Sequence, residues 1–189
     1  TNKLDAAVKR AYDAADNNRI LSNWNGSYAT VNEEIKGALI KVRARSRDLA
    51  NNNDYMRKFL ASVETNIVGP NGFDLQVYVT EDDGKLDNLA NAIIEENYKE
   101  WCRRGNCEIT GRFSFTELKR IVIKTVARDG ECLVREIKDP SVNKWGFALQ
   151  VLEIERLATN YNADLKNGNK VVMGVEVNKY GRNIAFYIL

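Results

Sequence analysis

Four carboxylates in the second half of the chain could hold a divalent cation. Asp129 and Glu131 flank Gly130, and Glu153 and Glu155 follow a later apolar stretch, so a folded sheet could bring all four together. Nucleases hold Mg²⁺ with such paired carboxylates. Acidic residues are also common at the ends of helices and strands, and residues 129–131 lie where a helix must turn sharply into a strand. We therefore expect a structural role for them and keep a carboxylate-metal nuclease as the minor alternative.

Other catalytic chemistry lacks the residue types that it needs. The chain contains no histidine, which removes the commonest general base and excludes Ser-His and Cys-His catalysis. Cys102 and Cys107 have no second cysteine pair and no histidine to complete a zinc site. With Cys132 they make three cysteines, an odd number. The chain also shows no apolar signal segment at its start, and together these features indicate free thiols. We therefore expect no catalytic residues, no metal, no cofactor and no enzyme activity.

Five basic residues on one predicted helix are the candidate binding residues: Lys36, Lys41, Arg43, Arg45 and Arg47. Such side chains can bind DNA phosphates. On a helix, however, these five flank an apolar stripe on both sides, as they do on a solvated or subunit-bridging helix. The net charge is only +2, from 28 basic and 26 acidic residues, which predicts no bulk attraction to nucleic acid or to a membrane. We favour a subunit contact over direct DNA contact.

Helices are expected through most of the first 129 residues, over about 1–70 and 85–129. Apolar residues recur at spacings of three and four in the stretches 4–15, 31–49, 56–67 and 86–101. Asn53 or Asp54 can cap the third of these helices. Ser114 and Glu117 form a capping box, which predicts a fifth helix that ends at Asp129 and Gly130.

Strands are expected over about 73–79 and 131–189. Residues 73–79 alternate between apolar and polar types, the period of a half-buried strand. Later stretches rich in Val, Ile, Leu and aromatic residues predict strands at 131–138, 147–154, 171–177 and 183–189, with a hairpin turn at 178–181. The order predicts one α+β domain over residues 1–189, in which N-terminal amphipathic helices pack on a mainly antiparallel sheet. Trp24, Trp101 and Trp145 are expected to anchor helices and loops to its core.

Several short motifs follow one another in order from about Tyr12 to Leu189. The two most distinctive are Arg-Ala-Arg-Ser-Arg-Asp-Leu at 43–49 and Arg-Asp-Gly-Glu at 128–131. Others are Asn-Ile-Val-Gly at 66–69, Ser-Phe at 114–115, Leu-Gln-Val-Leu-Glu at 149–153 and Gly-Val-Glu-Val at 174–177. Together they resemble the N-terminal part of the lambda-type family of tailed-phage portal proteins. The chain departs from the family at Asp54, where a proline is frequent, and at Tyr187, where a histidine is frequent.

The resemblance implies a structural subunit of a phage portal ring, usually twelvefold, at the capsid vertex. Such a ring is the conduit for DNA packaging and ejection and the docking site for the terminase motor. The implied partners are further copies of the chain, capsid and terminase proteins, and double-stranded DNA that passes through non-specifically, with no membrane. The implied location is the virion, with host cytoplasm during assembly, and a prophage could encode it. The chain is similar to the wing-like region, so the stem and clip would lie beyond residue 189. An assembly or adaptor protein of another capsid family is the remaining alternative.

Overall fold

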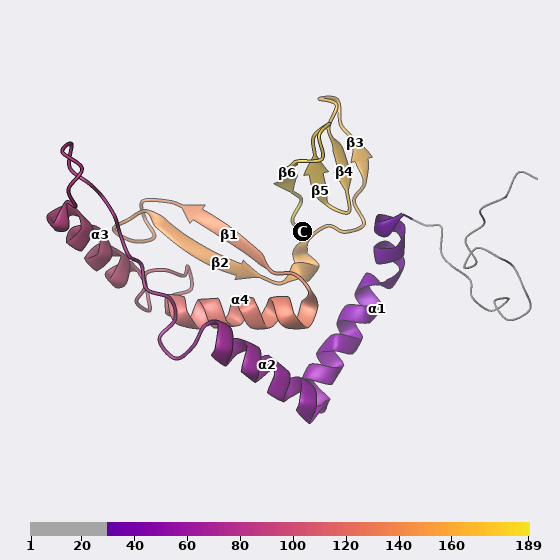
Figure 1. Cartoon of the computed structure of the whole chain (residues 1–189). Coiled ribbons are helices and arrows are strands. Elements are labelled where there is room, and N and C mark those ends of the chain that lie inside the picture. Colours follow the sequence, from indigo (N-terminus) through magenta and orange to yellow (C-terminus); the bar gives the residue numbers. More distant parts are fainter. Residues whose placement is uncertain (1–29) are drawn as a thin grey trace, which may run out of the picture. The chain divides into compact units, whose positions relative to one another are not determined.

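The computed structural model describes residues 30–189, which hold helices and antiparallel strands of an α+β fold (Figure 1). The helices are α1 (Val31–Asn52), α2 (Asp54–Ile67), α3 (Asn88–Trp101), α4 (Phe115–Asp129) and the 3-10 helix η2 (Ile154–Arg156). The strands are β1 (Leu133–Lys138), β2 (Phe147–Leu152), β3 (Ala163–Asp164), β4 (Lys170–Val172), β5 (Val175–Val177) and β6 (Asn183–Phe186). The chain divides into two compact units, residues 1–35 and 36–189, and α1 begins in the first and continues into the second. One domain over residues 1–189 stays a prediction, and the predicted helix over 4–15 and Trp24 lie outside the described residues.

The predicted start of α2 and the predicted start and end of α4 are confirmed by their caps. Asn53 is the N-cap of α2, and its side chain accepts a hydrogen bond from the Met56 amide. Ser114 and Glu117 form the complete capping box of α4. Gly130 follows α4 with a φ of 84°, in the left-handed region where glycine carries no Cβ penalty. These signals act between residues three or four apart, so the local sequence is enough to place them.

The strands form two antiparallel sheets instead of one. In the first, β1 pairs with β2 from Leu133 opposite Leu152 to Lys138 opposite Phe147. The second is a meander in the order β3-β4-β5-β6, and the predicted turn over residues 178–181 connects its last two strands. The Gly181 amide donates to the Asn178 carbonyl and closes that turn.

The predicted strand over residues 73–79 is wrong. Within residues 30–189 the segment has no partner strand, and two of its amides bond to side chains of α3 instead. The Val77 amide donates to Glu95 and the Val79 amide donates to Asn91. The alternating pattern therefore did not indicate a place in a sheet.

The predicted single strand over residues 171–177 is also wrong, because it contains a tight turn between β4 and β5. Met173 and Gly174 have φ values of 51° and 80°, as the two central residues of a type I′ hairpin turn require. A Cβ on residue 174 would lie 2.7 Å from the carbonyl oxygen of Ala158, so glycine is needed for close approach as well as for φ. Valines lie on both sides of the turn, so the sequence resembles one continuous apolar strand. The strand β3 has only two residues, which is too short to give a strand pattern in the sequence.

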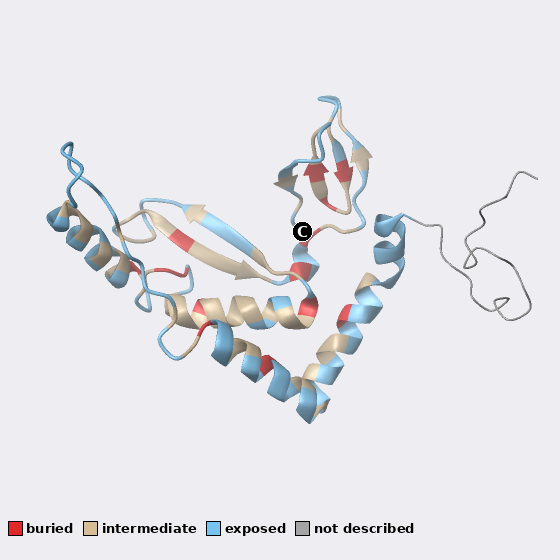
Figure 2. Cartoon of the chain, viewed as in Figure 1, coloured by how far each residue is buried: buried red, intermediate tan, exposed pale blue. Residues whose placement is uncertain are grey.

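An aromatic cluster around Trp101 joins α3, α4 and β2. The Trp101 ring lies 5.1 Å from the Phe115 ring and 5.7 Å from the Phe147 ring, between centroids. Its indole N–H donates to the Phe147 carbonyl at 3.0 Å, which satisfies the one polar atom of the side chain. Leu118 on α4 and Ala148 on β2 are buried as well, and Figure 2 shows buried segments, in red, on both elements. Trp101 therefore anchors a helix to the core, as predicted.

Candidate functional site

One face of α1 is attached to the rest of residues 36–189 mainly by charged groups. Arg43 and Arg47 lie one turn apart on this face, and their guanidinium groups reach the corner between α4 and β1 and the start of η2. Between them in sequence, the Ser46 hydroxyl donates to the Arg128 carbonyl at the end of α4. The helix is thus fixed by polar contacts at the end of α4 rather than by a large apolar interface.

Asp129 is the centre of this site. Its side chain is 1% exposed and accepts two forked pairs of hydrogen bonds. Arg47 donates from Nε at 3.0 Å and from Nη2 at 2.8 Å, and Arg128 donates from Nε and Nη2, both at 2.8 Å. Forked arginine–carboxylate pairs combine strong hydrogen bonds with a fixed geometry. Asp129 therefore fixes α1 to the last turn of α4.

Arg43 makes the second attachment. It is more deeply buried than Arg47, with 7% of its side chain exposed against 34% for Arg47. Its Nη2 donates to Glu131, the first residue after the Gly130 turn, and its Nη1 lies 3.5 Å from Glu155 of η2. Arg47 Nη1 lies 2.8 Å from the same Glu155 oxygen. We call the six residues Arg43, Arg47, Arg128, Asp129, Glu131 and Glu155 the arginine–carboxylate cluster. Its three positive and three negative groups balance, so it presents no net charge to a ligand.

The two most distinctive sequence motifs meet in this cluster. Arg43 and Arg47 belong to the motif at 43–49, and Arg128, Asp129 and Glu131 belong to the motif at 128–131. Sequence reasoning assigned the arginines to another subunit or to DNA and considered the acids as magnesium ligands, and it did not pair them. The only available signal was the balance of charge between two motifs that occur together.

The remaining predicted site residues lie elsewhere. Lys36, Lys41 and Arg45 are exposed on α1 and make no ion pair with the residues that the structure describes. Glu153 is exposed as well, and it joins neither the cluster nor any ion pair within residues 30–189. Over the same residues, no group of three cysteine, aspartate or glutamate side chains is arranged to hold a metal ion. Three of the four carboxylates considered for magnesium, Asp129, Glu131 and Glu155, are instead paired with guanidinium groups.

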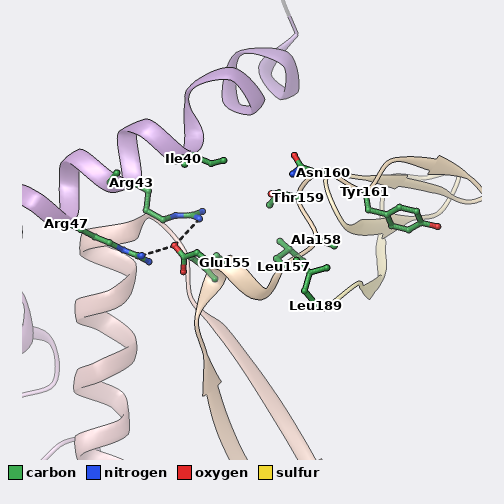
Figure 3. Close-up of a pocket in the computed structure, with 12 residues that line it drawn as sticks. Ile40, Arg43, Arg47, Glu155, Leu157, Ala158, Thr159, Asn160, Tyr161 and Leu189 are labelled. Carbon is green, nitrogen blue, oxygen red and sulfur yellow. Dashed lines mark ion pairs between the residues drawn. The ribbon is translucent and has the colours of Figure 1, made fainter.

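A cavity of about 740 Å³ lies beside the cluster (Figure 3). Its walls are mostly apolar, with Ile40 on α1 and Leu157 and Leu189 on the opposite side. Its charged wall consists of Arg43, Arg47 and Glu155, and both arginines pair with Glu155. No nucleophile with an adjacent base faces it from the residues that line it. The geometry supports a fixed position for α1.

Electrostatics within the cluster favour the ionised carboxylates. Burial alone raises the pKa of Asp129, but hydrogen bonds from Arg128 and Arg47 and their positive charges outweigh it and hold the pKa well below its usual value. For Glu155, burial raises the pKa, but the hydrogen bond from Arg47 and the charges of both α1 arginines make the net shift downward. Both groups therefore stabilise the fold only when they are ionised.

The stability of the chain is expected to decrease in acid because of these lowered pKa values. A carboxylate with a lowered folded-state pKa contributes fully above its unfolded value, about 4, and loses that contribution as the pH falls toward the folded value. Urea unfolding midpoints should therefore be constant from pH 7 to about 5 and fall below about pH 4. The Asp129→Asn variant should show a shallower acid decrease than the parent chain, and equal decreases would contradict the assignment.

Comparisons with known proteins agree with the sequence motifs. Residues 6–189 match the model of a family described as phage portal protein, lambda family. Over 188 residues the chain is 34% identical to a protein of Halomonas phage phiHAP-1 that is named a probable portal protein. The alignment covers 98% of this chain and 36% of that protein, so the chain spans about a third of the relative's length. In the described part of the chain, no helix combines the length and apolar character needed to cross a membrane.

Proposed function

The chain belongs to the lambda family of phage portal proteins, and from that membership we propose that it forms a wing-like region of a portal subunit. In this proposal the complete protein assembles into a homo-oligomeric ring at one vertex of the capsid. The ring contains twelve copies, the number that the resemblance to the family implies. The ring is the conduit through which DNA is packaged and ejected and the surface to which the terminase motor docks. Capsid proteins and non-specifically held double-stranded DNA complete its set of partners.

The observation that carries the proposal is the family match over residues 6–189. The balanced arginine–carboxylate cluster is consistent with it, since a structural subunit needs fixed elements and no reaction centre. The portal family is structural, which agrees with an assembly role without catalysis. In the proposed life cycle the protein is present in host cytoplasm during assembly and then in the virion.

The basic residues of α1 have two different roles in this proposal. Lys36, Lys41 and Arg45 are exposed and are candidates for contact with a neighbouring subunit or with DNA. Arg43 and Arg47 contribute indirectly, because their ion pairs hold the helix that presents the other three. Replacement of Arg43 or Arg47 would therefore alter assembly indirectly, because it would loosen α1. Only replacement of Lys36, Lys41 or Arg45 tests a contact with a partner directly.

Electron microscopy of the complete gene product tests the proposal. We expect closed rings with a central channel and, in particles isolated from infected or induced cells, one ring at a single vertex. A protein that stays monomeric and is distributed over the whole capsid shell would contradict the proposal. A ring that binds other capsid connectors but neither terminase nor DNA would identify an adaptor protein. Metal-dependent DNA cleavage that the Asp129→Ala substitution abolishes would identify a nuclease. Circular dichroism would show whether the Asp129→Ala variant is still folded.

A further inference from the structure

An exposed stripe of α1 points away from the arginine–carboxylate cluster. It consists of Ala38, Val42, Arg45 and Leu49, whose spacing of four, three and four residues places them on one helix face. All four are exposed within the described part of the chain, and Val42 retains 60% of its surface. Arg43 and Arg47 turn away from this face toward Glu155 of the cluster (Figure 3). The stripe is therefore presented to solvent by a helix that is held from another side.

A second exposed stripe with the same spacing lies on α3. It consists of Leu89, Ile93 and Glu96, which are exposed, and Glu100, which is half-buried and ion-paired with Lys144; the Leu89 and Ile93 side chains are 73% and 51% exposed. Another side of α3 carries Trp101, which is buried in the aromatic cluster. α3 is thus also held on one side and open on the other. The third position of its stripe is the acid Glu96, where the stripe of α1 has the base Arg45.

We propose that α1 of one subunit packs along α3 of a neighbouring subunit, an inference that rests on the proposed portal ring. The two helices run parallel and in register, with Arg45 opposite Glu96. In this register Ala38 faces Leu89 and Val42 faces Ile93, so a small side chain meets a large one and two branched apolar side chains pack together. The contact removes apolar surface of both stripes from water and pairs Arg45 with Glu96, while Glu100, the second acid of the α3 stripe, keeps its ion pair with Lys144 of its own chain.

Alternative pairings of the same stripes are less favourable. An antiparallel arrangement in register places Arg45 against Ile93 and Glu96 against Val42, which leaves both charges without a partner. Two α1 stripes packed on each other bring together a basic residue from each copy and no acid from the stripes. Such a contact is also isologous, and it closes a dimer, whereas a cyclic ring requires two different surfaces on each subunit. The α1 and α3 stripes supply two different surfaces with opposite charges.

Charge reversal in the complete gene product tests the pairing. Arg45→Glu and Glu96→Arg are each expected to cause loss of most of the ring population in light scattering after size-exclusion chromatography, because like charges then face each other. The double variant Arg45→Glu with Glu96→Arg is expected to restore rings. Lys166→Glu is the matched control, since Lys166 is an exposed base outside both stripes, and it should assemble as the parent protein does. Normal rings from both single variants, or no restoration in the double variant, would overturn the pairing.

Cross-linking gives an independent test that does not depend on loss of assembly. Subunits with Val42→Cys and subunits with Ile93→Cys are mixed before assembly and treated with a short bismaleimide. A covalent dimer is expected in the mixture and not with either variant alone, and its absence from assembled rings would contradict the contact. Lower melting temperatures of isolated monomers with Arg45→Glu would show that the stripe packs within its own chain and would also overturn the inference. If the parent protein forms no multimer at all, the proposed function fails and this inference fails with it, whereas normal rings with unaffected variants reject only the α1–α3 contact.

Discussion

Replacement of Asp129 by asparagine is expected to lower the free energy of unfolding by about 3 kcal/mol, near the low end for removal of one partner from a buried ion pair. The Asp129 side chain is 1% exposed and holds two guanidinium groups. Asparagine keeps the shape but loses the charge, and its NH2 group then faces arginine donors. The effect stays near the low end because Arg47 and Arg128 are each about one third exposed and keep some contact with water. Urea unfolding at pH 7, followed by circular dichroism, measures the difference.

The control for this prediction is Asp164→Asn, which makes the same chemical change on an exposed strand. The Asp164 side chain is 83% exposed and lies 3.8 Å from Lys170, so the expected change is within about 0.5 kcal/mol. Equal effects of the two substitutions at neutral pH would show that the cluster does not hold α1. A loss confined to Asp129→Asn would show that the attachment of α1 is a main source of stability in the chain.

Replacement of Trp101 by alanine is expected to have the largest effect, about 3–5 kcal/mol, as is typical for removal of a buried aromatic side chain. The ring fills the space between Phe115 and Phe147, and its N–H satisfies the Phe147 carbonyl. Alanine leaves a cavity where three elements meet and removes that hydrogen bond. Thermal and urea unfolding of the purified chain measure the loss.

Two further variants separate the contributions of volume and hydrogen bonding. Trp101→Phe keeps most of the aromatic volume and loses the N–H donor, so a smaller loss of about 1–2 kcal/mol is expected. Tyr180→Ala, at the exposed hairpin turn between β5 and β6, should change stability by less than about 0.5 kcal/mol. A Trp101→Ala variant as stable as Tyr180→Ala would mean that α3 is not anchored through this ring.

The sequence predicted those features that depend on near neighbours. The caps at Asn53 and Ser114 and the left-handed turn at Gly130 were all predictable, because each involves groups three or four residues apart. The same local reasoning failed for residues 73–79, where the amides bond to Asn91 and Glu95. It also failed at Met173 and Gly174, because an apolar run does not reveal that its backbone reverses direction.

The sequence by itself determined the helices within residues 30–189, the α+β class, the portal-family motifs and the absence of histidine chemistry. Only the tertiary structure decided what the charged residues do. Arg43 bonds to Glu131 across 88 residues and Arg47 bonds to Asp129 across 82, and these pairs separate two of the five basic residues from the three that remain exposed. The periodicity of α1 shows which side chains share a face. Which face meets an acid depends on where α4 ends against α1, and that position is set by packing between elements far apart in the chain.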